Sequence, residues 1–379
     1  MNDNLAPALH RDLTIALTTT DTLPRAVAYR LAWSLDRWLD RTSPSAALAT
    51  ELGVPETSLA RAFALRHTAD RDAATARARA ARHDARLVVA GDPDWPAALA
   101  TLAVPPPLLV VRGELPDAER PAVAIVGARR MNAYGRATAH RLATDLAALG
   151  IVVVSGFARG IDATAHDAAA ATGHTVAVLG CGIDIDYPRR SRALAERIAN
   201  RGALISEFPI GVEPRAWHFP VRNRIIAALG HGTLVIQASR RSGSLITAGR
   251  ALDLGRDVYA VPGRIDDPLA AGPNDLIADG AVPIRHVDDL LDCLPMTTRD
   301  RLTTPPIPID SAVETTARGV PARIATWLLD RPDPVDAETI ATALDVSIDR
   351  VLAALLELEL LSRIKRLPGP RFVAIRPRN

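Results

Sequence analysis

Four loops in the middle of the chain are rich in glycine, serine and arginine, the residue types that bind phosphate groups. Backbone N–H groups in glycine turns and at helix N-termini donate hydrogen bonds to phosphate oxygens, and arginine adds positive charge. Each loop follows a short apolar run typical of a buried β-strand. Because the carboxyl ends of parallel strands meet at one edge of a sheet, we expect the loops to converge on one anion-binding crevice. They are GARRMNAYG (127–135), SGFARGID (155–162), GCGIDIDYP (180–188) and ASRRSGSLIT (238–247).

The first of these loops places two cations behind a glycine. Gly127 lets the backbone approach a ligand closely, and Arg129 and Arg130 supply the charge. A dinucleotide site would need the GxGxxG spacing and an acidic residue at the end of the second strand, where Ser155 and Gly156 stand instead. The loop is therefore predicted to bind phosphate but not NAD.

The last of the four loops opens a predicted helix with two hydroxyls and a glycine, Ser242, Gly243 and Ser244, next to Arg241. Such a helix start donates both backbone and side-chain hydrogen bonds to a phosphate. Considered alone, the loop also fits an ordinary helix N-cap. The Gly-Lys-Ser/Thr sequence is absent, which excludes a Walker-type nucleotide site.

The segment 217–224 (WHFPVRNR) combines aromatic and cationic side chains in a chain with only 4% aromatic residues. In sites for single-stranded nucleic acid, an exposed aromatic ring stacks on a base while a nearby guanidinium holds the phosphate. Here the alternative is that Trp217 and Phe219 belong to the core and that the two arginines pair with Glu207 or Asp253. The stacking candidate is Phe219, and three polar neighbours complete the segment: Arg222, Asn223 and Arg224.

Asp162 and His166 stand four residues apart on a predicted helix and could form a catalytic dyad or part of a metal site. No third ligand accompanies them in the sequence, so a capping role for Asp162 is favoured. Cys181 and Cys293 are the only cysteines, too few for a disulfide framework or a cysteine-based zinc site. No catalytic residue, metal or cofactor is therefore expected.

The elements that must position these loops alternate along the chain between about Leu87 and Leu294. Short apolar runs followed by helical segments predict an α/β domain with a Rossmann-like, doubly wound sheet and right-handed crossovers. Two further strands precede the alternation, in LVVAGDPDWPAAL and PPPLLVVRG. The alternating strands are expected at 123–126, 151–154, 175–179, 203–206, 233–237 and 257–261. Helices are expected after Gly135, Gly160, Arg190, Arg222, Leu245 and Asn274.

The flanking segments predict two smaller domains. Residues 1–86 are expected to form a helical domain, with a helix stop at Gly53 and an apolar stripe at Val27, Leu31, Leu35 and Leu39. This domain ends in a run of arginines diluted by aspartates, which fits a solvated helix better than a basic face for DNA. Residues 295–315 are rich in Pro and Thr and predict a linker. Residues 316–379 show three helices and a hairpin, the order of a winged helix.

The third helix of this winged helix, residues 347–361, is apolar and acidic, with Arg350 as its only cation. A helix with so few hydrogen-bond donors is a poor reader of base edges, so protein contact is favoured over DNA contact. The cations of the hairpin still favour DNA contact by this domain. They are Arg363, Lys365, Arg366 and Arg371.

Composition limits the classes of function. The 379 residues carry 45 Lys and Arg against 43 Asp and Glu, a net charge of +2, so any affinity for nucleic acid must be local. Apolar residues make up 48%, ample for the cores of two or three domains, and Lys365 is the only lysine. No apolar run approaches the ~20 residues of a membrane span. The polar start (Asp3, His10, Arg11, Asp12) lacks the core of a signal peptide. We therefore expect a cytoplasmic protein with no membrane partner.

Seven ordered motifs resemble the DprA family (DNA-processing protein A, also called Smf). They occur in the family's order and at similar spacing between about Asp92 and Pro283, which makes the resemblance specific. The helical domain, of the SAM or helix-hairpin-helix kind, and the winged helix also resemble longer family members. The motifs are VAIVGARRMNAYG, VVVSGFARGIDATAHDAA, GCGIDIDYP, FPVRNRIIAAL, SGSLITAGRAL, GRDVYAVPG and AGPNDLIADGA.

The resemblance implies a Rossmann-like protein that binds single-stranded DNA, forms a homodimer and helps to load the recombinase RecA during natural transformation and recombination. It does not imply an enzyme. The DNA-binding residues that it implies are Arg129 in Gly-Ala-Arg, Phe219 as the ring against a base, Arg222 and Arg224 around Asn223, and Arg241 before Ser-Gly-Ser.

Two departures from the family pattern bear on function. Many relatives have serine where this chain has Ala128, and many have glutamate where it has Gln237. The second departure weakens any catalytic role that needs a carboxylate at this strand end. The alternative function is a hydrolase that cleaves N-glycosidic bonds of nucleoside monophosphates, as in related Rossmann-like folds. Such a hydrolase needs a PGGxGTxxE-type motif. This chain has only the partial matches Pro262-Gly263-Arg264 and Gly232-Thr233, which do not form it.

Overall fold

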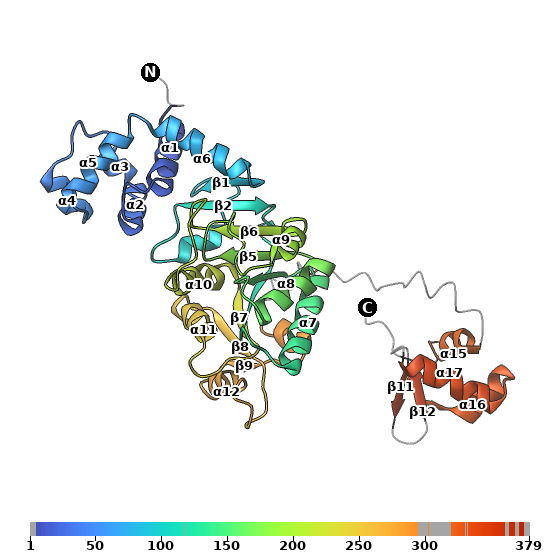
Figure 1. Cartoon of the computed structure of the whole chain (residues 1–379). Coiled ribbons are helices and arrows are strands. Elements are labelled where there is room, and N and C mark those ends of the chain that lie inside the picture. Colours follow the sequence, from blue (N-terminus) through green and yellow to red (C-terminus); the bar gives the residue numbers. More distant parts are fainter. Residues whose placement is uncertain are drawn as a thin grey trace. The chain divides into compact units, whose positions relative to one another are not determined.

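The computed structural model describes residues 5–117, 119–294, 302, 320–329, 331, 333–360, 364–367 and 371–374. By its internal contacts the chain divides into two compact units, Met1–Thr303 and Thr304–Asn379. The first unit contains a nine-stranded sheet with helices around it, and the second contains a small three-stranded sheet (Figure 1). Of the predicted linker 295–315, only Leu302 lies within the described residues.

The strands of the large sheet lie in the order β1-β2-β6-β5-β4-β3-β7-β8-β9. Neighbours from β6 to β9 run parallel, whereas β2 is antiparallel to both β1 and β6. The chain winds from β3 outward to β6, then returns to the other side of β3 with β7, so the predicted doubly wound sheet is confirmed. The strands are β1 Ala85–Val89, β2 Leu108–Gly113, β3 Ala122–Val126, β4 Val152–Ser155, β5 Thr175–Leu179, β6 Gly202–Ser206, β7 Gly232–Val235, β8 Asp257–Ala260 and β9 Val282–Pro283.

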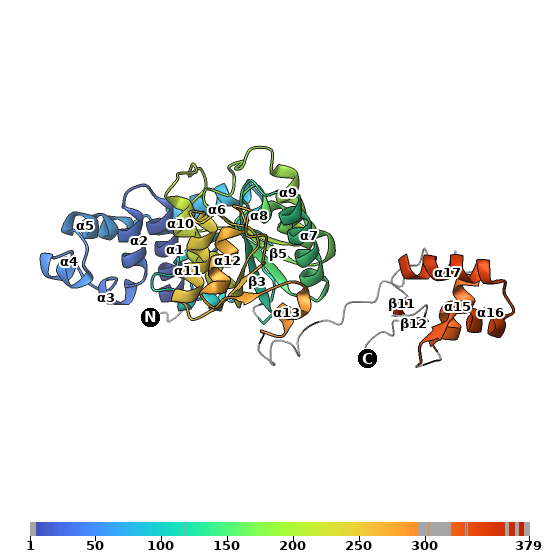
Figure 2. The same cartoon turned by 90° about the horizontal axis from the view of Figure 1, so that it is seen from below.

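Helices cover both faces of the sheet, as a parallel sheet requires (Figures 1 and 2). Ala124 and Val126 of β3 pack against α10 and α11, whereas Val123 and Ile125 pack against α7 and α8. Because both faces are core, these strands are continuous apolar runs in the sequence. One face carries α10 (His218–Leu229), α11 (Gly243–Asp253) and α12 (Ala271–Ala278). The other carries α7 (Ala133–Ala148), α8 (Ile161–Thr172), α9 (Arg192–Ala199) and α13 (Val287–Leu291).

Several of these helices begin earlier than the sequence predicts. The expected starts after Gly135, Arg222, Leu245 and Asn274 are wrong, because α7, α10, α11 and α12 begin at Ala133, His218, Gly243 and Ala271. The residues that suggested loops stand in the first turns. There the backbone N–H of a residue has no intrahelical partner, so proline and glycine cost little.

The helices before the sheet share a core around Trp38 and Leu31. Two of them, α1 and α6, also pack on the sheet, since Ile15 and Ala73 belong to one cluster with Val110 of β2. A short 3-10 turn, η1 (Ala97–Thr101), lies between β1 and β2. None of the described helices is long and apolar enough to cross a membrane. The helices are α1 Leu5–Thr19, α2 Arg25–Ala32, α3 Leu35–Trp38, α4 Ala46–Leu52, α5 Glu56–Leu65 and α6 Ala69–Ala81.

The predicted stop at Gly53 is confirmed, because this residue ends α4 with φ 63°. The single apolar stripe expected from Val27 to Leu39 is divided between two helices, α2 and α3. The chain turns between them at Ser34, whose hydroxyl donates to the carbonyl of Arg30 (2.8 Å).

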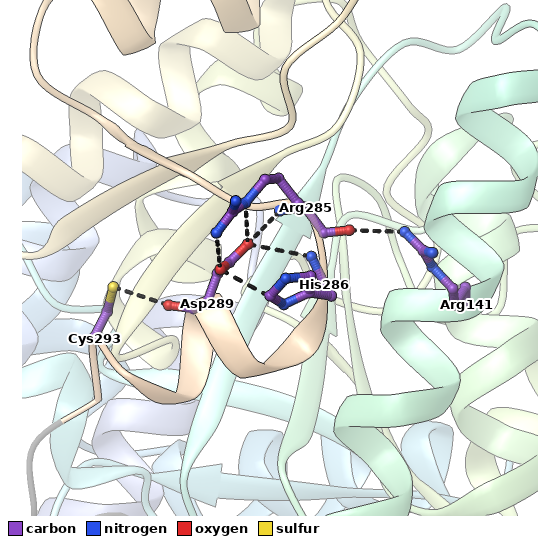
Figure 3. Close-up of polar contacts among 5 residues, drawn as sticks. All are labelled: Arg141, Arg285, His286, Asp289 and Cys293. Carbon is purple, nitrogen blue, oxygen red and sulfur yellow. Dashed lines mark hydrogen bonds and ion pairs between the residues drawn. The ribbon is translucent and has the colours of Figure 1, made fainter. Parts of the chain in front are cut away.

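A capped helix, α13, closes the described part of the first unit (Figure 3). Asp289 accepts hydrogen bonds from the backbone N–H groups of Arg285 and His286 and pairs with the Arg285 guanidinium at 2.8 Å. The Arg285 guanidinium makes the largest contribution to holding the pKa of Asp289 well below its usual range, and the two N–H groups add to the effect. Arg141 of α7 donates to the Arg285 carbonyl (2.9 Å) and so ties α13 to α7.

The second unit confirms the predicted winged helix. Helices α15 (Val320–Leu329), α16 (Ala337–Leu344) and α17 (Ile348–Leu360) share one core. The sheet has the order β10-β12-β11, from β10 (Val335–Asp336), β11 (Ile364–Leu367) and β12 (Arg371–Ala374). Helix α17 buries Val351 and Leu355 but leaves Leu352 and Leu356 exposed at 50% and 59%.

Candidate nucleic-acid interface

A cleft of about 690 Å³ opens at the carboxyl edge of the sheet, where the strand order reverses between β3 and β7. It draws on all four predicted loops and on the first turn of α10. The predicted site residues that line it are Gly127, Arg129, Arg130, Phe219, Arg222, Asn223, Ser242, Gly243 and Ser244. Ala128, Ala158, Asp162, Tyr187 and Ser239 also line it. The structure therefore brings the phosphate-binding and aromatic candidates together.

The loop after β3 presents two cations to solvent. Arg129 and Arg130 are exposed, and neither makes a hydrogen bond or ion pair with the described residues. The loop lies directly against α8, because a Cβ at Gly127 would stand 2.6 Å from the Cγ1 of Ile161. A larger residue at this position would therefore displace the loop or the Ile161 side chain.

Gln237 at the end of β7 holds the next part of this loop. Its amide nitrogen donates to Asn132 Oδ1 (2.8 Å), and its amide oxygen accepts from the Asn132 N–H (3.2 Å). A glutamate could accept but not donate, so the departure from the family pattern fits a positioning contact. Gly135 leaves room for the Gln237 side chain, which a Cβ there would strike.

The start of α11 carries a cap and a free cation. Ser242 is the N-cap, and its hydroxyl accepts from the Ser244 N–H (3.3 Å). Both serines also line the cleft, so the capping role does not remove them from the site. Arg240 pairs with Asp275 at 2.7 Å, whereas Arg241 is exposed and makes no hydrogen bond or ion pair within the described chain. Arg241 stands beside the cleft rather than in its lining.

Phe219 lies in the first turn of α10, half-buried at the wall of the cleft. One side of its ring faces Gly180, where a Cβ would approach the ring to 2.9 Å. The ring of Tyr187 packs at 5.4 Å between centroids, tilted by 34°, and the Arg129 guanidinium lies 5.3 Å from the Phe219 centroid. The core alternative for Trp217 is wrong, because its side chain is 54% exposed.

Arg222 lies at the floor of the cleft with its hydrogen bonds directed into the protein. Its guanidinium donates to the carbonyls of Gly156 (2.6 Å) and Val178 and to Asn223 Oδ1 (3.3 Å). Burial lowers the pKa of Arg222 to about 10, which still leaves the side chain charged at neutral pH. It therefore contributes positive potential to the cleft, while its Nε and Nη1 donors are occupied by protein acceptors.

Arg224 points to the other side of α10 and does not line the cleft. Its guanidinium pairs with Glu207 at 2.8 Å, as the alternative interpretation of this segment expects. Asn223, by contrast, faces the cleft and donates to the carbonyl of Gly243, the first residue of α11 (3.3 Å).

Asp162 and His166 have separate surroundings. Burial raises the pKa of Asp162 to about 6, although Arg222 and the Ala158 N–H stabilise the charged form. His166 Nδ1 contacts the Thr175 hydroxyl (2.7 Å), which itself donates to the Val153 carbonyl, so Nδ1 carries the proton. Burial lowers the pKa of His166 to about 3. The described residues contain no group of three metal-ligating side chains.

Among the cleft residues that were not predicted as site residues, Tyr187 and Asp162 bring an aromatic ring and a carboxyl group. Tyr187 stands in the loop GCGIDIDYP, and an aromatic residue at the end of a glycine loop was the available signal. Asp162 was considered as a helix cap, a metal ligand or part of a catalytic dyad, but not as a residue of the predicted DNA-binding cleft. A carboxyl group opposite the arginines of another loop could be placed only once the strand order was known.

Comparison with known proteins identifies the family. The family model for DNA recombination-mediator protein A matches residues 86–295, and the model for the DprA winged helix domain matches residues 306–370. The chain belongs to the DprA family. Protein Smf of Escherichia coli is 37% identical over 286 residues, covering 75% of this chain and 76% of that protein.

Solved DprA structures agree with the fold. The DprA of Streptococcus pneumoniae superposes with a TM-score of 0.62 at 30% identity, covering 75% of this chain and 96% of that one. The DprA of Helicobacter pylori, solved to describe its single-stranded DNA binding mode, gives a TM-score of 0.50 at 28% identity. It covers 55% of this chain and 94% of that one.

Proposed function

We propose that this DprA-family chain binds single-stranded DNA in the cleft between β3 and β7 and acts as a recombination mediator rather than as an enzyme. The main support for the proposal is that exposed arginines, which make no hydrogen bond or ion pair with the described residues, meet a half-buried aromatic ring at one cleft. Arg129 and Arg130 belong to one loop and Arg241 to another, so a phosphate backbone can be held from two sides.

The aromatic groups suit a base rather than a second phosphate. Phe219 and Tyr187 form a tilted pair at the wall of the cleft, and base–aromatic stacking is worth about 1–3 kcal/mol for each base. Both side chains are partly buried, so a base must leave its own stack and pair to reach them. This requirement favours a single strand over a duplex.

Further cations extend the proposed path beyond the cleft. Three exposed arginines lie in the segment from Tyr187 to the first residue of α9 and make no side-chain hydrogen bond or ion pair within the described chain. Asp186 fixes this segment by accepting from the backbone N–H groups of Arg190 and Ser191. The three arginines, which suit the phosphates that follow the stacked bases, are Arg189, Arg190 and Arg192.

The remaining parts of the proposal rest on the family. DNA recombination-mediator protein A is the name of the matching family, and the H. pylori relative was solved for its single-stranded DNA binding. On this basis we also propose a cytoplasmic homodimer that helps to load RecA. A pull-down of RecA with and without oligonucleotide tests the partner, and analytical ultracentrifugation tests the dimer.

The hydrolase alternative has no observation in its favour. The strand end where such an enzyme would need a carboxylate carries Gln237, whose amide is occupied by Asn132. The carboxyl group of Asp162 lines the cleft but is buried and bonded to the Ala158 N–H (3.3 Å).

A mobility-shift titration with single- and double-stranded oligonucleotides of the same sequence, at several salt concentrations, tests the proposal. We expect tighter binding to the single strand. The logarithm of affinity should fall with the logarithm of salt at about −0.7 per phosphate contact, so about four contacts give a slope near −3. Equal or tighter binding to the duplex at all salts would refute the proposal.

A further inference from the structure

A buried ionic cluster joins the N-terminal helices to the rear of α10. Glu207, just after β6, has a fully buried side chain, and its Oε2 accepts from Arg224 of α10 at 2.8 Å. The hydroxyl of Tyr29, on α2, donates to the same oxygen (3.0 Å). Burial and the nearby Glu207 raise the pKa of Tyr29 well above its usual value, so the hydroxyl keeps its proton. One carboxylate therefore connects α2 with α10.

A second contact runs parallel to the first. Arg25 of α2 donates to the Glu207 carbonyl (3.1 Å), and its guanidinium lies 3.9 Å from the centroid of the Phe208 ring. The Phe208 ring in turn packs on His218, the first residue of α10, at 4.1 Å between centroids. The start of α10 is thus held by stacked rings and its middle by an ion pair.

The two sides of α10 have different partners. Arg222 and Arg224 are two residues apart, which is about 200° around a helix. Arg222 and Asn223 bond to Gly156 and Gly243 at the cleft, whereas Arg224 bonds to Glu207 behind it. A shift of α10 on the rear side must therefore move the first turn that carries Phe219.

Burying the charged groups of this cluster costs free energy. Glu207 Oε1, Arg25 Nη1 and Arg224 Nη1 are all buried without a hydrogen-bond partner among the described residues. Buried charges lose hydration that their pairing does not fully restore, and apolar side chains of similar size often stabilise a fold equally well. What the ionic cluster adds is a fixed direction and distance between α2 and α10.

We propose that Glu207 and Arg224 are positioning residues through which the N-terminal helices set α10, and with it the shape of the DNA-binding cleft. The inference rests on the proposed function of that cleft. It assigns Arg224 to the protein interior rather than to a phosphate contact. It also gives the N-terminal helices a role in binding DNA without touching it.

The sign of one substitution separates the two assignments of Arg224. Glu207→Gln removes a negative charge and weakens the pair, so a phosphate-binding Arg224 would be released and single-stranded DNA would bind more tightly. A positioning role predicts the opposite, a loss of roughly three- to ten-fold in affinity. The salt slope should stay unchanged, because no phosphate contact is lost.

Variants of Arg224 and Tyr29 in the full chain complete the test. Arg224→Ala should weaken binding without changing the slope, and Arg224→Lys should restore part of the loss. Tyr29→Phe, a mild change, should weaken binding less. Tighter binding by Glu207→Gln, or a slope that flattens by about 0.7 in Arg224→Ala, would overturn the inference. The matched control is Glu51→Gln, which removes a negative charge from an exposed pair with Arg37.

A measurement without DNA distinguishes this inference from the proposed function. Hydrogen exchange of the α10 amides should be faster in Tyr29→Phe and Glu207→Gln than in the parent chain, while exchange in α7 stays the same. Unchanged exchange in α10 would contradict the positioning role even if the protein binds DNA. Faster exchange together with no binding of single-stranded DNA by the parent chain would instead refute the proposed function.

Discussion

Replacing Gly180 by alanine should weaken binding of single-stranded DNA by displacing a ring that the substitution does not remove. A Cβ at Gly180 would lie 2.9 Å from Cδ1 and 3.0 Å from Cε1 of Phe219. Favourable carbon–carbon contacts occur at about 3.5–4.0 Å, so the ring must move outward by roughly 0.5–1 Å or change rotamer. Phe219 would then lose its place beside Tyr187 and Arg129.

The size of the effect follows from stacking. A base on an aromatic ring is worth about 1–3 kcal/mol, and a displaced ring should lose part of this, about 1 kcal/mol or roughly five-fold in affinity. Phe219→Ala should lose the whole contribution. Neither variant removes a phosphate contact, so both should keep the salt slope of the parent chain.

Fluorescence anisotropy with a labelled single-stranded oligonucleotide at several salt concentrations measures both quantities. Gly249→Ala is the matched control, because a Cβ there meets nothing within 4 Å and the residue lies in α11, whose first turn also lines the cleft. Parent-like affinity in Gly180→Ala together with weak binding in Phe219→Ala would show that the position of the Phe219 ring does not determine affinity. A flattened slope in Gly180→Ala would refute the division between stacking and charge.

Four further predictions concern charge and domain roles. Arg129→Ala should weaken binding and flatten the salt slope by about 0.7, and an unchanged slope would count against a phosphate contact. Asp162 has its pKa raised to about 6 from 3.8, so the folded chain holds a proton that the unfolded chain has lost between these values. The contribution of Asp162 to stability therefore falls as pH rises from about 4 to 6, and Asp162→Asn should raise the melting temperature at pH 7. Protonation of Asp162 also removes a negative charge from the cleft, so the affinity for DNA should rise as pH falls through about 6. The rise should be smaller in Asp162→Asn. Equal pH profiles of affinity in the two chains would contradict this prediction. A chain ending at Leu294 should bind single-stranded DNA within a few-fold of the full chain, because α17 exposes Leu352 and Leu356 and carries Arg350 as its only cation. Loss of binding with an unchanged circular dichroism spectrum of the sheet unit would assign DNA binding to the winged helix.

The sheet could be predicted from the sequence because its strands carry their own signal. Segments such as Val123–Val126 are buried on both faces, so they are continuous apolar runs bounded by glycine loops. The same regularity predicts that the loops meet at one edge. Helix starts were less predictable, since Pro220 and Pro273 stand in first turns where a missing N–H costs nothing.

The orientation of side chains around α10 could not be predicted. Arg222 and Arg224 have the same chemistry and nearly the same position in the sequence, yet they lie on opposite sides of the helix. Which one faces the cleft depends on how α10 crosses the sheet. Arg224 faces away from the cleft because it pairs with the buried Glu207. The position of Glu207 follows from the pairing of β6 with β5 rather than from any local sequence pattern.

Photochemical crosslinking tests most directly whether the cleft holds the strand. A single-stranded oligonucleotide with iodouracil at successive positions is bound to the full chain, irradiated, and mapped by mass spectrometry. We expect crosslinks to Phe219 and Tyr187 at the cleft wall. Crosslinks confined to the winged helix, or to the arginine-rich helix α6, would contradict it.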